Sequence, residues 1–265
     1  MKLTRNNTSF TVSGFKKTYP YQYKNYTRND NDGPRTYNVE DKKVPSVTTI
    51  LSATQSSEKR RTLENWRNRV GHEEAARITT QAATRGTEMH FVLEQYMNGV
   101  GYLNLGEDGS LPRMMAHTII NNLQNLSEVY GTEINLAYED RWAGSTDLVC
   151  NYNGMPTIGD FKQSNKPKRE EWIEDYYYQI AAYSLAHKHQ YGEIEQGAIF
   201  VCTKNLLFQE FIMDKNMLLE YEERWLEKVD KYHKNANFRL FCQKNELLRG
   251  PYRRFKKVPD PLVTP

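Results

Sequence analysis

The chain lacks the residue patterns that mark several common classes of protein. Its three cysteines, Cys150, Cys202 and Cys242, form no CxxC pair, so a zinc ribbon, an iron–sulfur cluster and a disulfide framework are not expected. No apolar run reaches about 18 residues, the length that a membrane-spanning helix needs. The N-terminal residues contain no apolar stretch of the kind found in a signal peptide. These absences predict a cytoplasmic protein with no membrane partner, in the host cytoplasm if the gene is carried by a phage.

Charge and composition leave the class of partner open. Hydrophobic residues make up 38% and charged residues 26% of the 265 positions, which is typical of a soluble globular protein with one substantial core. The formal net charge is only +3, so a polyanionic partner is compatible with the chain but is not required by it. No obligate protein partner is implied.

The composition changes along the chain and predicts three parts. Residues 1–43 form an N-terminal arm in which aromatic residues alternate with lysines from Phe15 to Tyr26, before a loop at Asn29–Pro34. The arm either stacks bases and holds phosphates or packs as strands and loops on the body of the protein. Residues 44–250 form the main domain, and residues 251–265 form a basic tail.

Apolar periodicity predicts helices on both sides of a β-rich centre. The first helix is expected over residues 58–78, with apolar anchors at Leu63, Trp66, Val70 and Ile78. Further helices are expected over 85–96, 115–130 and 170–190, and after Asp214 as an N-terminal cap. Strands are expected within 133–162 and over 196–202 and 206–213. This order predicts an α/β fold with a mixed central β-sheet flanked by helices.

The centre of the chain contains a strong β-hairpin signal. Asn153-Gly154 lies between two β-prone runs, and this pair favours a type I′ turn because both of its central residues need positive φ. Counting outward from a two-residue turn places Asp147 opposite Asp160, with Cβ atoms roughly 4.5–5.5 Å apart. A one-residue bulge at Pro156 would shift this register and is the alternative.

Two facing carboxylates repel each other unless a cation or a shared proton compensates for their charge. Oxygen ligands of this kind suit Mg²⁺ or Mn²⁺. Strand alternation places Lys162 on the same face as Asp160, where its ammonium could orient the attacking water or stabilise charge on a phosphate. The segment therefore predicts a phosphodiesterase site, and the alternative is a solvated surface ion pair.

These residues resemble the motifs of a known nuclease superfamily. Gly144–Asp147 followed by Asp160-Phe161-Lys162 resembles the Asp…(Asp/Glu)-x-Lys motif of the PD-(D/E)XK nucleases. Gly86-Thr87-x-x-His90 with Glu94, and Gln179-x-x-x-Tyr183, resemble two further motifs of the RecB-type members. Segments 44–51 and 160–168 are similar to the mitochondrial genome maintenance exonucleases and their phage and bacterial relatives. The resemblance extends over residues 40–235.

The resemblance implies a restriction-endonuclease-like core in residues 44–250, with the antiparallel hairpin as its catalytic element. It also implies a metal-dependent DNA exonuclease that favours single strands with free ends and acts in replication, recombination or repair. The Mg²⁺ or Mn²⁺ ligands would be the carboxylates of Asp147 and Asp160, the backbone carbonyl of Phe161 and, as an outer ligand, His90. Glu133 is the expected additional acid, and Glu94 and Glu139 are its alternatives.

The same resemblance gives roles to residues around the metal site. Lys162 would assist the nucleophilic water. Gln179 and Tyr183 lie one turn apart on a predicted helix and would point to one place, where Gln179 could fix Lys162 or a phosphate; alternatively, both line a half-buried helix face. Gln163 stands where relatives commonly have threonine, which puts a local hydrogen bond in doubt. The DNA contacts are predicted at Arg85, Thr87, Ser164, Lys166, Lys168 and Arg169, which would bind without sequence preference.

Three other functions stay open at this point. A non-catalytic nucleic-acid-binding protein on a nuclease fold is disfavoured because Asp147, Asp160 and Lys162 are all present. An endonuclease of the same superfamily would share every motif. A hydrolase of small phosphoesters would leave the basic residues without a role.

Overall fold

The structure is a computed structural model that describes residues 14–31, 33–100 and 110–247. The predicted basic tail, residues 251–265, lies outside the described residues. Among the described residues, none of the helices combines the length and the apolar character that crossing a bilayer requires.

A six-stranded mixed sheet forms the centre of the fold, in the order β1-β5-β6-β7-β8-β9. Its strands are β1 (Lys16–Lys17), β5 (Leu126–Tyr138), β6 (Trp142–Tyr152), β7 (Met155–Ser164), β8 (Gln196–Thr203) and β9 (Phe208–Met213). The β1–β5 and β7–β8 pairs are parallel, and the other pairs are antiparallel. The parallel β7–β8 pair needs a crossover, which the helix between the two strands supplies.

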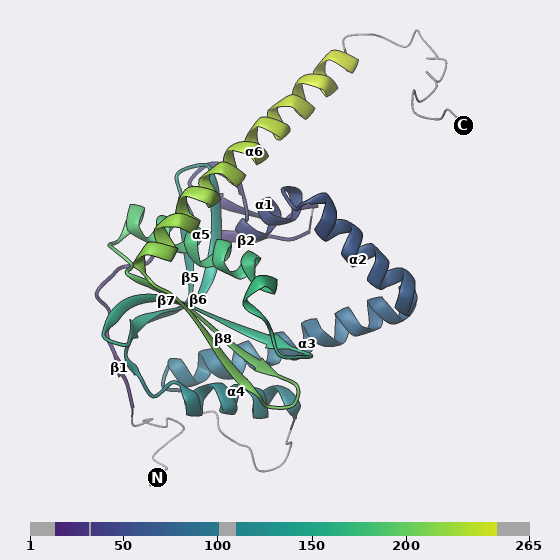
Figure 1. The fold of residues 1–265 in the computed structure, drawn as a ribbon. Helices are drawn as coiled ribbons and strands as arrows, with labels where there is room; N and C mark the ends of the chain where they lie inside the picture. Colours follow the sequence, from purple (N-terminus) through teal and green to yellow (C-terminus); the bar gives the residue numbers. More distant parts are fainter. Residues whose placement is uncertain (1–13, 32, 101–109, 248–265) are drawn as a thin grey trace.

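Helices cover both faces of this sheet (Figure 1). The first face carries α3 (His72–Met97) and α4 (Leu111–Asn122), and the second carries α1 (Val47–Ala53), α5 (Glu174–Gln190) and α6 (Lys215–Leu247). Strand alternation divides the apolar residues between two cores, so Leu148 packs towards α3 and α4 while its neighbour Val149 packs towards α5 and α6. The expected fold class, a mixed central sheet flanked by helices, is confirmed.

A second, three-stranded sheet is built from the N-terminal part of the chain. It contains β2 (Thr27–Asn29), β3 (Thr36–Val39) and β4 (Lys42–Pro45). Tyr37 and Val44 of this sheet are buried against Ala137 and Ala143 of the large sheet. Strand β4 crosses the boundary expected at residue 44, and the division of the chain into arm, domain and tail stays a prediction.

The aromatic residues before this sheet contact the body of the protein. The Tyr21 ring packs edge-on against His187 with centroids 4.9 Å apart, and the Tyr23 ring packs against Tyr191 with centroids 4.8 Å apart. Tyr19, in contrast, is 75% exposed. Most of the rings that alternate with lysines are therefore in contact with other parts of the fold.

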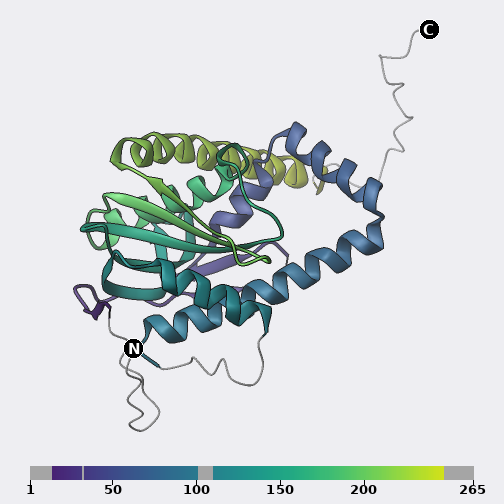
Figure 2. The same cartoon turned by 60° about the horizontal axis from the view of Figure 1, so that its bottom comes forward.

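The expected boundary between the first two helices is wrong. The helix predicted over 58–78 ends at Gly71, whose φ of +90° stops α2 (Ser57–Val70), and α3 begins directly afterwards and runs through Gly86. The expected anchors of α2 are also wrong, because α2 buries no residue and Leu63 is 40% exposed. Figure 2 shows α2 and the first half of α3 extending away from the sheet, which explains the lack of burial.

The helix predicted over 115–130 is shorter than expected. α4 ends at Asn122, and Leu126 and Tyr130 lie in β5, paired with β6. The apolar spacing of residues 123–130 is compatible with a helix and with a strand. The hydrogen-bonded pairing of β5 with β6 stabilises the strand. The last helix begins as expected, since the Asp214 carboxylate accepts the backbone N–H of Met217 at 2.8 Å.

A substitution in the β6–β7 turn tests the hairpin that positions Asp147 and Asp160. Gly154 has a φ of +79° and open space around its Cα, so Gly154→Ala introduces backbone strain without a clash. We expect a loss of about 1–2 kcal/mol in the free energy of unfolding, measured by urea titration. Gly14, which also has open space but no positive φ, is the control. Equal effects of Gly154→Ala and Gly14→Ala would contradict this account of the turn.

Candidate active site

The hairpin register is the one expected from the sequence. Asn153 and Gly154 have φ values of +55° and +79°, as a type I′ turn requires. The ladder runs from Tyr152–Met155 to Leu148–Gly159 without a bulge at Pro156. Asp147 and Asp160 are the next residues on their strands, directly beyond the last ladder pair.

A third acid occupies the same position on the neighbouring strand. Strand β5 pairs Thr132 with Leu148 and Ile134 with Thr146, so the register leaves Glu133 opposite Asp147. Glu133 has a φ of +50°, which interrupts the extended backbone at this point. Glu133, Asp147 and Asp160 therefore lie side by side across three adjacent strands, where the backbone ladders are interrupted.

Helix α3 brings a histidine to this row of acids. His90 Nδ1 lies 3.4 Å from Asp147 Oδ1, while the second carboxylate oxygen of Asp147 accepts the backbone N–H of Phe161 at 2.7 Å. His90, Glu133 and Asp147 each offer a ligand atom, and these atoms lie within 4.8 Å of one another. The Ser145 hydroxyl donates to Glu133 Oε2 at 3.2 Å and fixes that carboxylate beside the other two groups.

Asp160 and Lys162 form an ion pair on one face of β7, as strand alternation predicts. Asp160 is only 3% exposed. Its Oδ2 atom contacts the ammonium but has no hydrogen-bond partner with acceptable geometry among the described residues. The Lys162 ammonium also lies 5.2 Å from the centre of the Tyr176 ring, so its position is set on two sides.

The positive charges of the site do not fully compensate for the negative charges of its three carboxylates, as the pKa values of these groups indicate. Burial, followed by the neighbouring Asp147 carboxylate, raises the pKa of Glu133 to about 7. Burial also raises the pKa of Asp160, although Lys162 opposes the shift. For Asp147, burial is outweighed by His90 and Lys162, which hold its pKa below the usual range. Part of the cluster therefore holds protons that a cation would displace.

The cationic and hydroxyl groups stay protonated. Burial would lower the pKa of Lys162, but Asp160 and Asp147 raise it above its ordinary value. Burial would likewise lower the pKa of His90, and the Asp147 carboxylate reverses the shift. Burial, with the Asp160 carboxylate, raises the pKa of Tyr183 well above its ordinary value. At neutral pH, Lys162 and Tyr183 are therefore hydrogen-bond donors.

This donor set fits a divalent cation. His90, Glu133 and Asp147 are close enough to share one ion, and Asp160, whose Oδ2 is ion-paired with Lys162, adds a buried carboxylate in the same row. Carboxylate-rich sites of this kind suit Mg²⁺ or Mn²⁺, for which an imidazole is an acceptable additional ligand. Phe161 is held here through its N–H rather than its carbonyl. The ligand roles of all five residues stay predictions.

Tyr183 and Gln179 come from α5, on the second face of the sheet. The Tyr183 ring packs against Gly144, where a Cβ would lie only 2.7 Å from the ring. Glycine at this position therefore lets the ring reach the strand that carries Asp147. Gln179 is half-buried one turn earlier, and no residue in the described part of the chain forms a hydrogen bond with its side chain. The catalytic roles predicted for both stay untested.

Arg85, predicted to contact DNA, is engaged within the protein. Its Nε and Nη2 atoms donate to Gln163 Oε1 at 2.9 and 2.7 Å, and Nη2 also contacts Asn165. Gln163 in turn donates to the Ala82 carbonyl at 3.0 Å. Gln163 thus ties α3, the helix of His90, to the end of β7.

The other predicted DNA contacts differ in how available they are. The Ser164 hydroxyl donates to the Lys166 carbonyl at 2.6 Å within a turn, and the Thr87 hydroxyl donates to Ala83 in its own helix at 3.1 Å. Lys168 is half-buried, and burial lowers the pKa of its ammonium. Thr87, Lys166 and Arg169 are exposed, and Lys166 and Arg169 are the exposed cations of this set.

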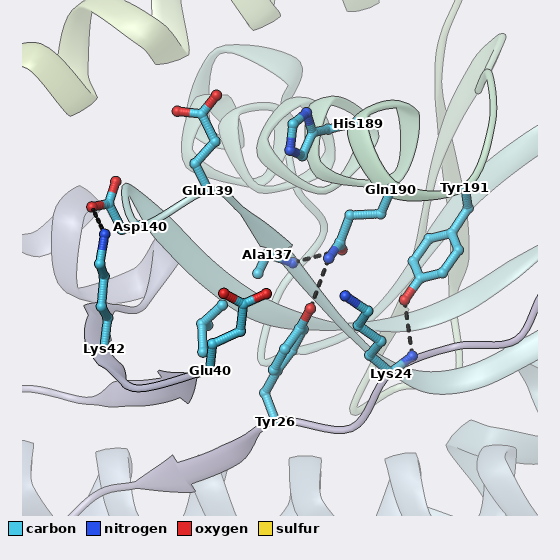
Figure 3. Close-up of a pocket in the computed structure, with 11 residues that line it drawn as sticks. Lys24, Tyr26, Glu40, Lys42, Ala137, Glu139, Asp140, His189, Gln190 and Tyr191 are labelled. Carbon is cyan, nitrogen blue, oxygen red and sulfur yellow. Dashed lines mark hydrogen bonds and ion pairs between the residues drawn. The ribbon is translucent and has the colours of Figure 1, made fainter.

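The structure separates the three acids proposed for the additional ligand. Glu139 lies at the β5–β6 turn and lines another cavity, of about 460 Å³, together with Glu40 and His189 (Figure 3). Glu94 lines the same cavity as Asp147. Glu133 alone of the three belongs to the cluster with His90 and Asp147, so the geometry favours the residue that was expected first.

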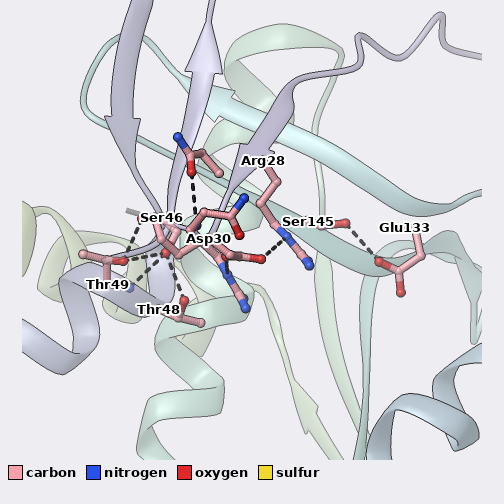
Figure 4. Close-up of polar contacts among 10 residues, drawn as sticks. Arg28, Asp30, Ser46, Thr48, Thr49, Glu133 and Ser145 are labelled. Carbon is pink, nitrogen blue, oxygen red and sulfur yellow. Dashed lines mark hydrogen bonds and ion pairs between the residues drawn. The ribbon is translucent and has the colours of Figure 1, made fainter. Parts of the chain in front are cut away.

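A cavity of about 530 Å³ opens beside the acids, and sequence reasoning missed part of its lining. Beside His90, Glu133, Asp147 and Tyr183, it is lined by residues of the small sheet and of the start of α1, namely Arg28, Arg35, Tyr37, Ser46, Val47 and Thr48. Figure 4 shows Arg28, Ser46 and Thr48 in one view with Ser145 and Glu133, and Arg28 is the one that points toward Ser145. The resemblance of segment 44–51 to relatives could have indicated that the α1 residues belong to the site. No pattern in the sequence indicated this for Arg28 and Arg35.

The chain is similar in sequence to mitochondrial genome maintenance exonuclease 1. It is 28% identical to the Mus musculus protein over 201 residues, covering 71% of this chain and 59% of the relative. The identity to the Homo sapiens protein is 25% over 209 residues, covering 73% and 60%, and that to the Xenopus tropicalis protein is 27% over 204 residues, covering 72% and 58%. The chain spans three fifths or less of each relative's length, and the resemblance expected from the motifs is confirmed.

No model of a known protein family matches the chain. Among solved structures, a proposed exonuclease from Eubacterium rectale matches with a TM-score of 0.35 and 16% identity, over 56% of this chain and 68% of that chain.

Removing the charge of Glu133 tests the repulsion in the row of acids. The pKa of Glu133 rises from 4.5 to about 7 on folding, so the unfolded chain loses this proton first and the charge favours unfolding as pH rises through that window. In metal-free protein, we expect Glu133→Gln to raise the midpoint of thermal unfolding, and to raise it more at pH 8 than at pH 5.

Glu139→Gln is the matched control for this experiment. Glu139 shares the φ of +50° with Glu133 but lies at the separate cavity, so its backbone strain is the same and its carboxylate neighbours differ. The same pH-dependent gain in both variants would contradict the repulsion.

Proposed function

We propose that the protein is a divalent-metal-dependent DNA exonuclease that acts on strands with free ends and favours single strands. The observation that carries the proposal is the row Glu133–Asp147–Asp160, with His90 beside Asp147 and Lys162 paired with Asp160. The relatives' name supports exonuclease activity and, through its reference to genome maintenance, a role in DNA replication, recombination or repair. The metal requirement, the substrate and the process belong to the proposal.

The metal would be held by Asp147, Glu133 and His90, with Asp160 adjacent. When bound, Mg²⁺ or Mn²⁺ supplies the positive charge that polarises the scissile phosphate and activates the attacking water. Metal binding requires the deprotonated form of Glu133, so a proton competes with the metal for this carboxylate below about pH 7.

Lys162 would stabilise negative charge rather than accept a proton. Its pKa is raised by Asp160 and Asp147, against the effect of burial, so it carries an ammonium at the pH of the reaction. Asp160 holds this ammonium in place. An ammonium that is positioned before the reaction stabilises charge that develops on the phosphate in the transition state.

Tyr183 would contribute a neutral donor. Its hydroxyl keeps its proton and belongs to the lining of the cavity beside Asp147. A protonated hydroxyl there can donate to a non-bridging phosphate oxygen without adding charge to the site. The ring is held by its contact with Gly144.

Basic residues around the site favour a polynucleotide over a small phosphoester. Lys166 and Arg169 are exposed just after β7. The protruding helix α2 adds exposed arginines, Arg60, Arg61, Arg67 and Arg69. A small phosphoester would fill the cavity without reaching these groups, whereas a DNA strand could contact them through its phosphates.

Lys162→Ala tests this proposal, with Lys188→Ala as its control. The side chains of both lysines are 21% exposed, and each pairs with an acid whose side chain is 5% exposed, Asp160 for Lys162 and Glu222 for Lys188. We expect Lys162→Ala to lower the rate of DNA hydrolysis about 100-fold or more, because a donor to the transition state is lost. Lys188→Ala should affect stability and leave the rate per folded molecule unchanged.

The measurement is digestion of end-labelled single- and double-stranded DNA, with one end blocked in turn, in Mg²⁺, Mn²⁺ or chelator. Loss of label only from free ends and only with metal is the expected result. Equal cutting of closed circles would replace the exonuclease with an endonuclease, and intact DNA with wild-type protein in both metals would contradict the proposal.

A further inference from the structure

The cavity beside the row of acids has a basic wall as well as an acidic one. Arg28 of β2 and Arg35, just before β3, line it together with Glu133 and Asp147. One carboxylate holds both arginines, since Asp30 Oδ2 lies 2.8 Å from Arg28 Nε and Asp30 Oδ1 lies 2.7 Å from Arg35 Nε. In Figure 4, the Arg28 side chain is drawn between Asp30 and Ser145, whose hydroxyl donates to Glu133.

The backbone around this trio is fixed by hydrogen bonds. The Arg35 carbonyl accepts the Ser46 N–H at 3.1 Å and the Thr49 hydroxyl at 2.8 Å. Asn29 Oδ1 accepts the N–H of Asn31 at 3.2 Å and shapes the turn that carries Asp30. The backbone that carries the two arginines is therefore fixed, and Asp30 pairs with both guanidinium groups before any ligand arrives, which reduces the entropy cost of binding one.

The trio keeps both a net positive charge and free hydrogen-bonding capacity. Two guanidinium groups face one carboxylate, and the Arg28 and Arg35 side chains are 53% and 42% exposed. A guanidinium has five N–H donors, so a contact with Asp30 leaves most of them for another acceptor. Paired guanidinium groups match the geometry of a phosphate more closely than that of any uncharged acceptor.

We propose that Arg28 and Arg35, held by Asp30, bind a phosphate of the DNA strand adjacent to the scissile bond. The small sheet would then form one wall of the substrate site, opposite the metal ligands. The inference rests on the proposed function, which places the scissile phosphate at Asp147. A cavity of about 530 Å³ falls within the range of pockets that enclose small ligands, about 300–1,000 Å³, and so has room for one nucleotide unit between the two walls.

The bound phosphate has two possible sources in a DNA strand. It is either an internal phosphodiester, which every strand offers, or a terminal phosphate, which only one end carries. Both present the same oxygens to the arginines, and binding to oligonucleotides with and without a terminal phosphate separates them.

The experiment measures binding of a 20-residue oligodeoxythymidylate in Mg²⁺, in a Lys162→Ala background, in which hydrolysis is expected to be about 100-fold slower or more. The oligonucleotide carries a 5′-phosphate, a 3′-phosphate or neither, and salt is varied. The arginine variants are Arg28→Ala, Arg35→Ala and the charge-preserving Arg28→Lys and Arg35→Lys. Lys42→Ala is the control, because Lys42 lies in the same small sheet and pairs with Asp140 beside the other cavity.

We expect each alanine variant to bind about tenfold more weakly than the Lys162→Ala protein. The slope of log affinity against log salt should fall by about 0.7 for each lost contact with a single strand. The lysine variants should keep the slope, because they keep the charge, while losing part of the affinity. Loss on all three oligonucleotides assigns the site to an internal phosphodiester, and loss confined to one phosphorylated end assigns it to a terminal phosphate.

An affinity and a salt slope that match those of Lys42→Ala would overturn the inference. If an alanine variant does not fold, as judged by its thermal unfolding, the corresponding lysine variant decides: unchanged affinity in a folded lysine variant contradicts recognition by the guanidinium group. Hydrolysis by the wild-type protein is scored separately, so a nuclease whose arginine variants behave like the control disproves this inference alone.

Discussion

Repulsion among the carboxylates of Glu133, Asp147 and Asp160 is the constraint on which the rest of the site depends. Three adjacent strands bring these acids to one level of the sheet, where the ladders on both sides of β6 are interrupted. Burial strengthens their repulsion, because less water screens it. The ammonium of Lys162 compensates for part of the negative charge, and the raised pKa of Glu133 favours its protonated form. Glu133 also has a positive φ, which interrupts β5 at this level. A divalent cation would relieve the same repulsion more completely.

The rest of the fold holds these groups together against that repulsion. Asp147 and Asp160 extend from strands whose neighbours, such as Leu148 and Phe161, are buried between the sheet and α3 and α4. His90 is carried by α3, and the bonds of Arg85 with Gln163 fix that helix to the strand of Lys162. Packing far from the acids thus sets distances within the site, which is what the proposed reaction at a phosphate requires.

Sequence reasoning recovered those parts of the site that depend on local geometry. The Asn153-Gly154 turn fixes the register of the hairpin, because the pairing of strands follows directly from a two-residue loop. The side of the sheet on which Lys162 lies follows from alternation alone. The approach of His90 to Asp147 was available only through the resemblance to nucleases, since no periodicity in the sequence relates α3 to β6.

The features that could not be predicted from the sequence depend on long-range packing or on unusual backbone conformations. The positive φ of Glu133 has no sequence signal, because glutamate rarely adopts it. Gly71 could not be identified as a helix break from the sequence, because a single glycine within an apolar pattern can lie inside a helix or end it. Arg28 and Arg35 reach the cavity only because the small sheet packs on Ala137 and Ala143, a contact between segments about a hundred residues apart.

The most direct test of the central claim is the position of Mn²⁺ in crystals of the protein, located by its anomalous scattering. The account predicts a peak within about 2.5 Å of carboxylate oxygens of both Asp147 and Glu133, lost in Asp147→Asn crystals soaked in the same way. A peak elsewhere on the molecule, or none at these carboxylates at millimolar Mn²⁺, would contradict it.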